Sequence, residues 1–118
     1  MILLIILILI VPIAEMVGHP DMFVKAGATI NLTCIISQSP EPPAFVFWYH
    51  NDRMINYDYN SIAETSVHKD TTKSDTVISR LVIRNAKLHD SGNYTCTPSN
   101  AEPTSIYVHV LQGKQSTS

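Results

Sequence analysis

The stretch LHDSGNYTC, residues 88–96, combines residues of a protein core with a motif of a protein surface. Tyr94 stands two residues before Cys96, behind an Asp-x-Gly turn, and both side chains have the character of core residues. Asn93-Tyr94-Thr95 is also an N-glycosylation acceptor, which belongs on a surface. A β-strand reconciles the two because successive side chains point to opposite faces. We therefore expect Tyr94 and Cys96 to face inward, and Asn93 and Thr95 to face outward.

The same alternation of apolar and polar residues runs along most of the chain. It occurs in residues 28–36, 44–50, 76–84, 93–100 and 105–111, which are rich in β-branched and aromatic residues. The turn-forming clusters SQSPEPP, HNDR, KDTTKSD, HDSG and SNAEP separate them. No convincing helical period appears after residue 20. This succession of short alternating runs and turn clusters predicts seven or more short strands in an antiparallel β-sandwich.

Two cysteines and one tryptophan follow one another as Cys34, Trp48 and Cys96. This order is typical of an immunoglobulin-like core, in which the cysteines lie on strands of opposite sheets and the tryptophan packs on their bridge. A disulfide closing so long a loop stabilises the fold by about 4 kcal/mol in the chain-entropy model. The alternative is two free buried thiols in a cytosolic protein. Two glycosylation acceptors and an apolar N-terminus favour the disulfide and an oxidising compartment.

The turn before Cys96 predicts a tyrosine corner. We expect the Tyr94 ring to be buried and its hydroxyl to reach back to the backbone of the preceding turn. Gly92 permits the tight turn. Asp90 is expected to cap the turn and to pair with an arginine, either Arg80 or Arg53.

The motif L-x-I…D-x-G-x-Y-x-C, carried by Leu81, Ile83, Asp90, Gly92, Tyr94 and Cys96, resembles the intermediate set of immunoglobulin domains. Residues 11–113 further resemble the second immunoglobulin domain of the defective proboscis extension response family, most distinctively in SPEPPAFVFWYHN and NYTCTPSNAEP. These are insect neuronal cell-surface proteins with two tandem immunoglobulin domains and a C-terminal membrane attachment. The resemblance implies recognition of cell-surface immunoglobulin proteins and a role in synapse organisation.

The chain departs from that family in two ways. The first domain, which in the family carries the partner-binding face, is missing, and the C-terminus ends in GKQSTS without a hydrophobic tail. A truncated isoform and an incomplete gene model remain alternatives. We expect an apolar segment over residues 1–14, a linker over 15–20, an immunoglobulin-like domain over 21–112 and a polar tail over 113–118.

The segment Met1–Ala14 is almost entirely apolar. As a helix it would be about 21 Å long, whereas a hydrocarbon core is about 30 Å thick. Its length fits the apolar region of a signal peptide, although no Lys or Arg precedes it. A signal peptide, an uncleaved anchor and a segment without any targeting role all remain open.

The composition and the motifs do not support nucleic-acid binding or catalysis. The net charge is −2 and the eight Lys and Arg are scattered, so the sequence predicts no nucleic-acid interface. His89, Asp90 and Ser91 are consecutive and cannot meet as a catalytic triad. The histidines are dispersed, and an approach of His109 to His50 would still supply only two metal ligands. We expect no catalytic site, cofactor or metal.

The surface features point to recognition. Asn31 and Asn93 are predicted outward glycosylation acceptors. Phe45, Phe47 and Tyr49 form an outward aromatic row, a candidate interaction face for a protein partner. The alternative is that neighbours such as Tyr107, or the missing first domain, cover this row.

The sequence thus predicts a non-enzymatic extracellular module of a cell-surface recognition protein, with immunoglobulin-family proteins as partners. The resemblance implies the plasma membrane of neurons, although a secreted protein fits equally. Membrane association would come from the apolar head or a missing C-terminal anchor. A structural spacer without its own partner is the alternative, and without the first domain the usual partners should bind weakly or not at all.

Overall fold

The computed structural model describes residues 11–55 and 63–112. Most of the expected apolar segment, residues 1–10, and the expected tail 113–118 lie outside the described residues. The elements found in the described ranges are β1 (Ile13–Met16), β2 (Asp21–Lys25), β3 (Ile30–Ser37), β4 (Val46–His50), β5 (Arg53–Met54), β6 (Ala63–Lys69), β7 (Val77–Ile83), the 3-10 helix η1 (Leu88–Asp90), β8 (Gly92–Pro98) and β9 (Thr104–Leu111). The predicted all-β sandwich is confirmed.

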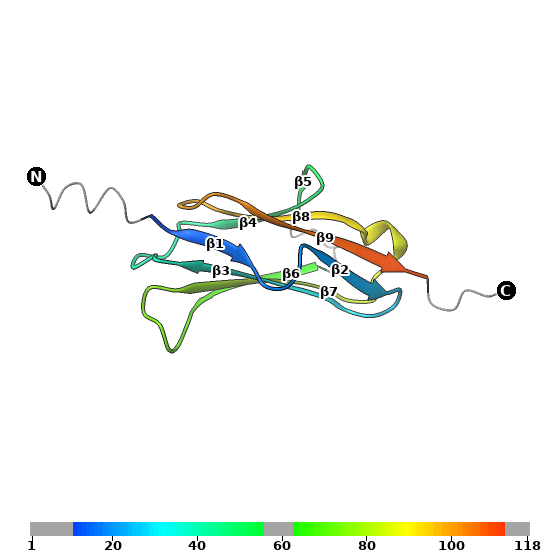
Figure 1. Cartoon of the computed structure of the whole chain (residues 1–118), viewed down its shortest axis with the longest axis horizontal. Coiled ribbons are helices and arrows are strands. Elements are labelled where there is room, and N and C mark those ends of the chain that lie inside the picture. Colours follow the sequence, from blue (N-terminus) through cyan, green and yellow to red (C-terminus); the bar gives the residue numbers. More distant parts are fainter. Residues whose placement is uncertain (1–10, 56–62, 113–118) are drawn as a thin grey trace, which may run out of the picture.

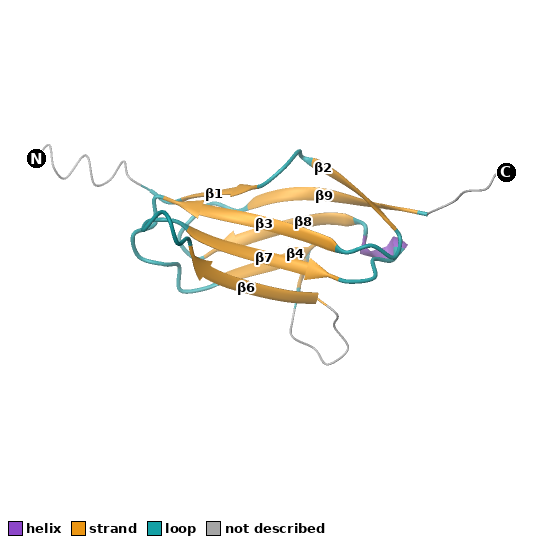
Figure 2. Ribbon diagram, turned by 90° about the horizontal axis from the view of Figure 1, so that it is seen from below, coloured by secondary structure: helices purple, strands orange, loops and turns teal. Residues whose placement is uncertain are grey.

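The strands form two sheets that pack face to face (Figure 1). The first sheet has the order β1-β3-β7-β6, and the second has the order β2-β9-β8-β4-β5. Neighbouring strands are antiparallel except for β2 and β9, which run parallel. In Figure 2, β3, β7 and β6 lie in front of β8 and β4 of the second sheet. The described chain enters at one end of the sandwich and leaves at the opposite end (Figure 1).

The chain changes sheets between β1 and β2. The Val17 N–H still donates to the carbonyl of Thr33 on β3, at 2.9 Å, whereas the Pro20 carbonyl already accepts from Tyr107 on β9, at 2.9 Å. Gly18 makes this crossing with a φ of +104°, a conformation that costs glycine little because it has no Cβ.

The first strand lies partly inside the segment that we expected to be a linker. β1 pairs with β3, with Glu15 opposite Ile35 and Met16 opposite Cys34. The expectation of a linker over residues 15–20 is therefore wrong for these two residues. The sheet begins earlier because the short alternation of Ile13–Met16 suits an edge strand, half buried on one face.

The core lies between the sheets and is built from alternate positions of the long strands. β3, β7 and β8 each bury every second side chain. The buried apolar residues are Ile30, Leu32, Cys34, Ile36, Trp48, Val77, Leu81, Ile83, Ala86, Tyr94, Cys96, Ile106, Val108 and Val110. Their alternation turns the intervening residues of the second sheet outward, where the candidate interaction face lies.

Candidate functional site

A disulfide joins the two sheets at the centre of the core. Cys34 on β3 and Cys96 on β8 are bonded, with Cα atoms 6.5 Å apart. Trp48 on β4 pairs with Cys96 in register and is 1% exposed. Its indole Nε1–H donates to the hydroxyl of Ser79 on β7, at 3.0 Å. The sequence predicted the cysteines and the tryptophan, but not the buried serine that satisfies the indole.

Tyr94 forms the expected corner. Its buried hydroxyl donates to the Asp90 carbonyl at 2.5 Å. The His50 ring stacks on the Tyr94 ring, with centroids 4.5 Å apart and planes 4° from parallel, and His50 Nε2 donates to the Ser91 carbonyl at 2.9 Å. Burial raises the pKa of Tyr94, and the nearby Asp90 carboxylate raises it further. The corner therefore requires a neutral phenol, and His50 is a part of it that sequence reasoning missed.

Asp90 caps the turn as predicted, but the expected ion pair with Arg80 or Arg53 is wrong, because the described residues contain no ion pair between Asp90 and either arginine. Its carboxylate accepts the backbone N–H of Lys87 at 2.8 Å and lies 3.8 Å from the exposed His89 ring. Arg80 instead lies beside His68 on the outer face of the first sheet, with Nη1 and Nε2 3.3 Å apart. Strand alternation is the reason: Ser79 and Leu81 point inward, so Arg80 points away from the turn.

Gly92 is required at the start of β8. Its φ is +143°, and a Cβ placed there would lie 2.7 Å from His50 Nε2 and 2.8 Å from Asn51 Oδ1. The position thus demands glycine both for its backbone conformation and for the close approach of the turn between β4 and β5.

The candidate aromatic row begins at the proline-rich loop before β4. The Ser99 hydroxyl accepts the N–H groups of Ala44 at 2.8 Å and Phe45 at 3.4 Å, and the Ser99 N–H donates to the Phe45 carbonyl at 3.0 Å. This fixes the start of β4 against the end of β8. The Phe45 and Phe47 rings stack with centroids 4.2 Å apart. The two rings therefore form one exposed apolar group, while Tyr49 is half-buried further along the strand.

A hollow of about 400 Å³ adjoins this pair of rings at the edge between the two sheets. It is lined by Phe45, Val46, Phe47, Trp48, Met54, Ile55, Thr65 and Val67. Four of these residues, namely Phe45, Phe47, Met54 and Val67, are exposed by 38–50%. We call these four the apolar rim. Exposed apolar side chains gathered around one hollow are the anchors that protein interfaces use, and Met54 and Val67 were not predicted.

Tyr107 does not cover the aromatic row. It lies opposite Asn93 on β8, and its ring contacts His109 at a centroid distance of 4.7 Å. His109 in turn stacks on Phe23 at 4.7 Å. We call Phe23, Tyr107 and His109 the Tyr107 patch. The candidate face of Phe45, Phe47, Tyr49 and Tyr107 is therefore two separate groups.

Small hydroxyl side chains separate the two groups. Thr97 is the register partner of Phe47, and Thr95 that of Tyr49. The Thr95 hydroxyl bonds the Ser105 hydroxyl at 2.8 Å. Phe23 and His109 are the members of the face that sequence reasoning missed.

The two glycosylation acceptors lie on different sheets. Asn31 is exposed on β3, opposite Val82 on β7. Asn93 is half-buried on β8, with Nδ2 3.5 Å from the Thr95 hydroxyl of its own acceptor motif. The inward neighbours of both acceptors, Leu32 and Tyr94, are buried.

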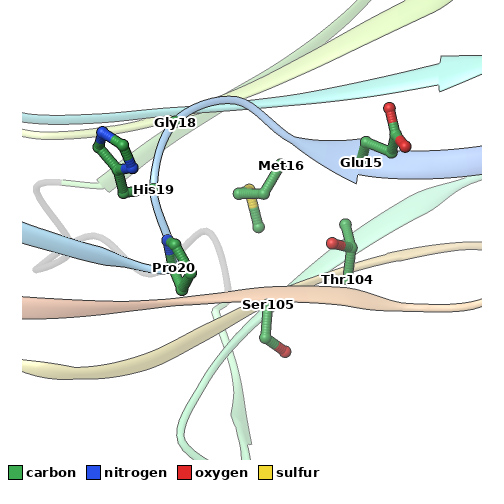
Figure 3. A pocket seen from close by; sticks show the side chains of 7 residues that line it. All are labelled: Glu15, Met16, Gly18, His19, Pro20, Thr104 and Ser105. Carbon is green, nitrogen blue, oxygen red and sulfur yellow. The ribbon is translucent and has the colours of Figure 1, made fainter.

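A second hollow, of about 440 Å³, lies where the chain passes from β1 to β2 (Figure 3). Met16, Pro20 and Thr104 face it, whereas Ser105 points to the other side of β9. The polar side chains of Glu15 and His19 lie at its rim and do not converge (Figure 3). This hollow offers no arrangement of polar groups for a ligand.

The structure also places the histidines apart. His50 contacts Tyr94, whereas His109 lies 2.8 Å from Asp21 Oδ1 at the other edge of the sheet. In residues 11–55 and 63–112, no three His, Cys, Asp or Glu side chains are grouped as a metal site requires. No helix in these ranges is long and apolar enough to cross a membrane.

The fold and its core residues match a known family. The family model for the immunoglobulin domain matches residues 15–100, which is more than half of the chain. The chain belongs to the immunoglobulin domain family.

Two human proteins contain similar sequences, and the chain spans only 13% and 6% of their lengths. The leucine-rich repeat, immunoglobulin-like domain and transmembrane domain-containing protein 2 is 36% identical over 81 residues, 69% of this chain. Cartilage intermediate layer protein 1 is 30% identical over 82 residues, also 69% of this chain.

Solved structures of immunoglobulin domains are similar too. The immunoglobulin domains of Dpr2, in a crystal structure with DIP-Theta, are 28% identical, with a TM-score of 0.72 over 86% of this chain and 50% of that chain. The Down syndrome cell adhesion molecule is 17% identical, with a TM-score of 0.66 over 86% of this chain and 13% of that chain. The second likeness shows the fold alone. This chain thus shares the immunoglobulin fold with the domains of both proteins, and the Dpr2 structure contains such domains in a complex with another immunoglobulin protein.

Proposed function

We propose that this domain is an extracellular recognition module of a neuronal cell-surface protein of the Dpr type, and that it contacts cell-surface immunoglobulin proteins through the apolar rim. The observation that carries the proposal is the convergence of Phe45, Phe47, Met54 and Val67 on one hollow. The likeness to Dpr2, which was crystallised bound to an immunoglobulin protein, supports the kind of partner.

The rim has the chemistry of an interface centre. Protein interfaces bury about 800 Å² per partner and concentrate their binding energy in a few apolar or aromatic anchors. The stacked rings of Phe45 and Phe47 restrict each other, so that little side-chain entropy remains to be lost on binding. The small hydroxyl side chains of Thr95 and Thr97 lie on the neighbouring strand β8, Thr97 directly opposite Phe47. A partner side chain entering the hollow would meet apolar walls on both sheets.

The test is surface plasmon resonance with the full chain, secreted behind a cleavable signal peptide, against a panel of immunoglobulin-family ectodomains. We expect the usual partners of the resembled family to bind weakly or not at all, and at least one other ectodomain to show saturable binding at micromolar concentration that is lost in Phe45→Ser/Phe47→Ser. The matched control is Phe23→Ser, an exposed phenylalanine on the same sheet but outside the rim. An equal loss of binding with Phe23→Ser would show that the apolar rim is not the contact surface.

The second candidate is a structural spacer. The positions where the described chain enters and leaves, at opposite ends of the sandwich, favour it (Figure 1). An absence of binding across the panel would support the spacer and overturn the recognition proposal.

We further propose that the sequence is one domain of a longer protein and that Asn31 and Asn93 carry N-linked glycans. The share of the relatives that the chain spans supports the first point, and sequencing of transcripts beyond both ends tests it. The outward direction of both asparagines supports the second. Mass spectrometry of the secreted chain before and after enzymatic release of glycans tests the two acceptors separately.

A further inference from the structure

The acceptor Asn93 stands beside an exposed aromatic surface. Asn93 on β8 and Tyr107 on β9 are direct register partners on the outward face. The Cβ atoms of such a pair are about 5 Å apart. On the next strand, Asp21 lies opposite Tyr107, and Phe23 lies opposite His109. The Tyr107 patch therefore begins at the nearest neighbour of Asn93 and extends away from it to the edge of the sheet.

The Tyr107 patch is exposed to solvent. The Phe23 side chain is 65% exposed and that of Tyr107 is 43% exposed. The rings of Phe23 and His109 are nearly parallel, with an angle of 14° between their planes. They form a flat apolar platform with a polar edge, because His109 Nε2 lies 2.8 Å from the Asp21 carboxylate.

The other side of Asn93 is occupied by protein. The turn between β4 and β5 is tied to β8, because Asn51 N–H donates to the Asn93 carbonyl at 2.6 Å and Asn51 Oδ1 accepts the Asn93 N–H at 3.0 Å. β5 rises above the outer face of the second sheet (Figure 1). A group attached to Asn93 Nδ2 is thus hindered toward β4 and open toward β9 and β2, where the Tyr107 patch lies.

We propose that the N-linked glycan of Asn93 folds over the Tyr107 patch, so that this patch is the docking surface for the carbohydrate of the chain itself. The inference rests on the proposed glycosylation of Asn93. A pyranose ring has an apolar face of C–H groups that packs on an aromatic ring, and hydroxyl groups at its rim that bond polar side chains. The Tyr107 ring offers the first surface, and Asp21 and His109 offer hydrogen-bonding groups beyond it.

The acceptor Asn31 provides an internal comparison. Its register partner on β7 is Val82, and no aromatic residue is a direct cross-strand neighbour of Asn31 in the described pairing. Removal of the Asn31 glycan should therefore change the thermal midpoint of unfolding, Tm, by the same amount whether or not an aromatic side chain has been replaced. The two glycans are attached by the same chemistry and differ only in the protein side chains around them.

The experiment is a double-mutant cycle on the full chain secreted from insect cells. Wild type, Asn93→Gln, Tyr107→Ser and the double variant are compared by Tm. We expect Asn93→Gln to lower Tm by about 2 to 6 °C in wild type and by less than about 1 °C with Tyr107→Ser, because the contact is already lost. Two variants serve as controls. Phe47→Ser removes an exposed aromatic ring outside the Tyr107 patch, and Asn31→Gln removes the other glycan.

Two further measurements protect the conclusion. Enzymatic trimming of the glycan to one N-acetylglucosamine, applied to wild type and Tyr107→Ser, needs no substitution at Asn93. In NMR spectra, an upfield shift of an N-acetyl methyl resonance that disappears in Tyr107→Ser would place the sugar on the ring. Mass spectrometry that finds Asn93 unmodified sinks the proposed glycosylation. A modified Asn93 with additive Tm changes and no such NMR shift overturns the docking inference alone.

Discussion

The indole N–H of Trp48 donates to the Ser79 hydroxyl across the two sheets, at 3.0 Å. Both residues are buried, and Ser79 lies opposite Cys34 in register. The polar bond between the sheets therefore lies next to the disulfide between the sheets. A serine in the middle of the apolar positions of β7 is explained by the need of the tryptophan for an acceptor, because an unpaired buried donor is costly.

Ser79→Ala should lower the free energy of unfolding by about 1 to 3 kcal/mol, because the buried indole N–H loses its acceptor. Urea denaturation measures this change. In a Trp48→Phe background the same substitution should cost much less, since no donor remains. Equal costs in both backgrounds would show that the bond contributes nothing.

Tyr94→Phe should destabilise the domain by about 1 to 2 kcal/mol at neutral pH, because the Asp90 carbonyl loses its donor. The raised pKa of Tyr94 adds a dependence on alkaline pH. Its contribution is complete below the unfolded pKa of about 10 and is lost as pH rises above that value, since only the unfolded phenol ionises readily. Denaturation midpoints between pH 8 and 11.5 should fall less steeply in Tyr94→Phe. Tyr107→Phe, at an exposed ring, is the control and should follow wild type.

Two glycines with positive φ form a matched pair. Gly92→Ala meets backbone strain and a contact of 2.7 Å with His50, whereas Gly18→Ala meets the strain alone, with nothing within 4 Å of its Cβ. We expect Gly18→Ala to lower the free energy of unfolding by about 1 to 2 kcal/mol. Gly92→Ala should lower it by clearly more. Thermal unfolding of both variants checks the order, and a reversed order would contradict the position of His50. His50→Ala should recover part of the loss in Gly92→Ala.

Removal of the disulfide should cost about 2 to 5 kcal/mol, the usual range for a native bond in a small domain. Cys34→Ala/Cys96→Ala, measured by urea denaturation against the oxidised chain, tests this. Mass spectrometry of secreted material with and without reduction counts the thiols. Two free thiols in the untreated chain would contradict the bond and the expected oxidising compartment.

The long strands could be predicted because each buries one face against the core. In residues 30–37 and 77–83, apolar side chains recur at every second position, and the structure buries those same positions. The edge strands β1, β2 and β6 were harder to predict because much of their surface is exposed and half of their residues can be polar. Even Ser79 follows the alternation, although its hydroxyl gave no sign of being buried.

The candidate face was only partly predictable. Alternation told which side chains point outward, as for Phe45 and Phe47. It did not tell which outward residues meet across strands, because that depends on register. Tyr107 is the example: its register places it beside Asn93 and Phe23, not over β4. Likewise, Met54 and Val67 join one hollow only because two sheets meet at that edge.

The parallel pairing of β2 with β9 determines how the domain resists a pulling force. The start of β2 points toward the end where the chain enters, and the end of β9 points toward the opposite end where it leaves (Figure 1). Tension applied between these two ends would slide the strands along each other and load their transverse hydrogen bonds together, in shear. An antiparallel hairpin pulled at its open ends would instead lose its bonds one after another. Under such tension, the β2–β9 pair would therefore act as a mechanical clamp.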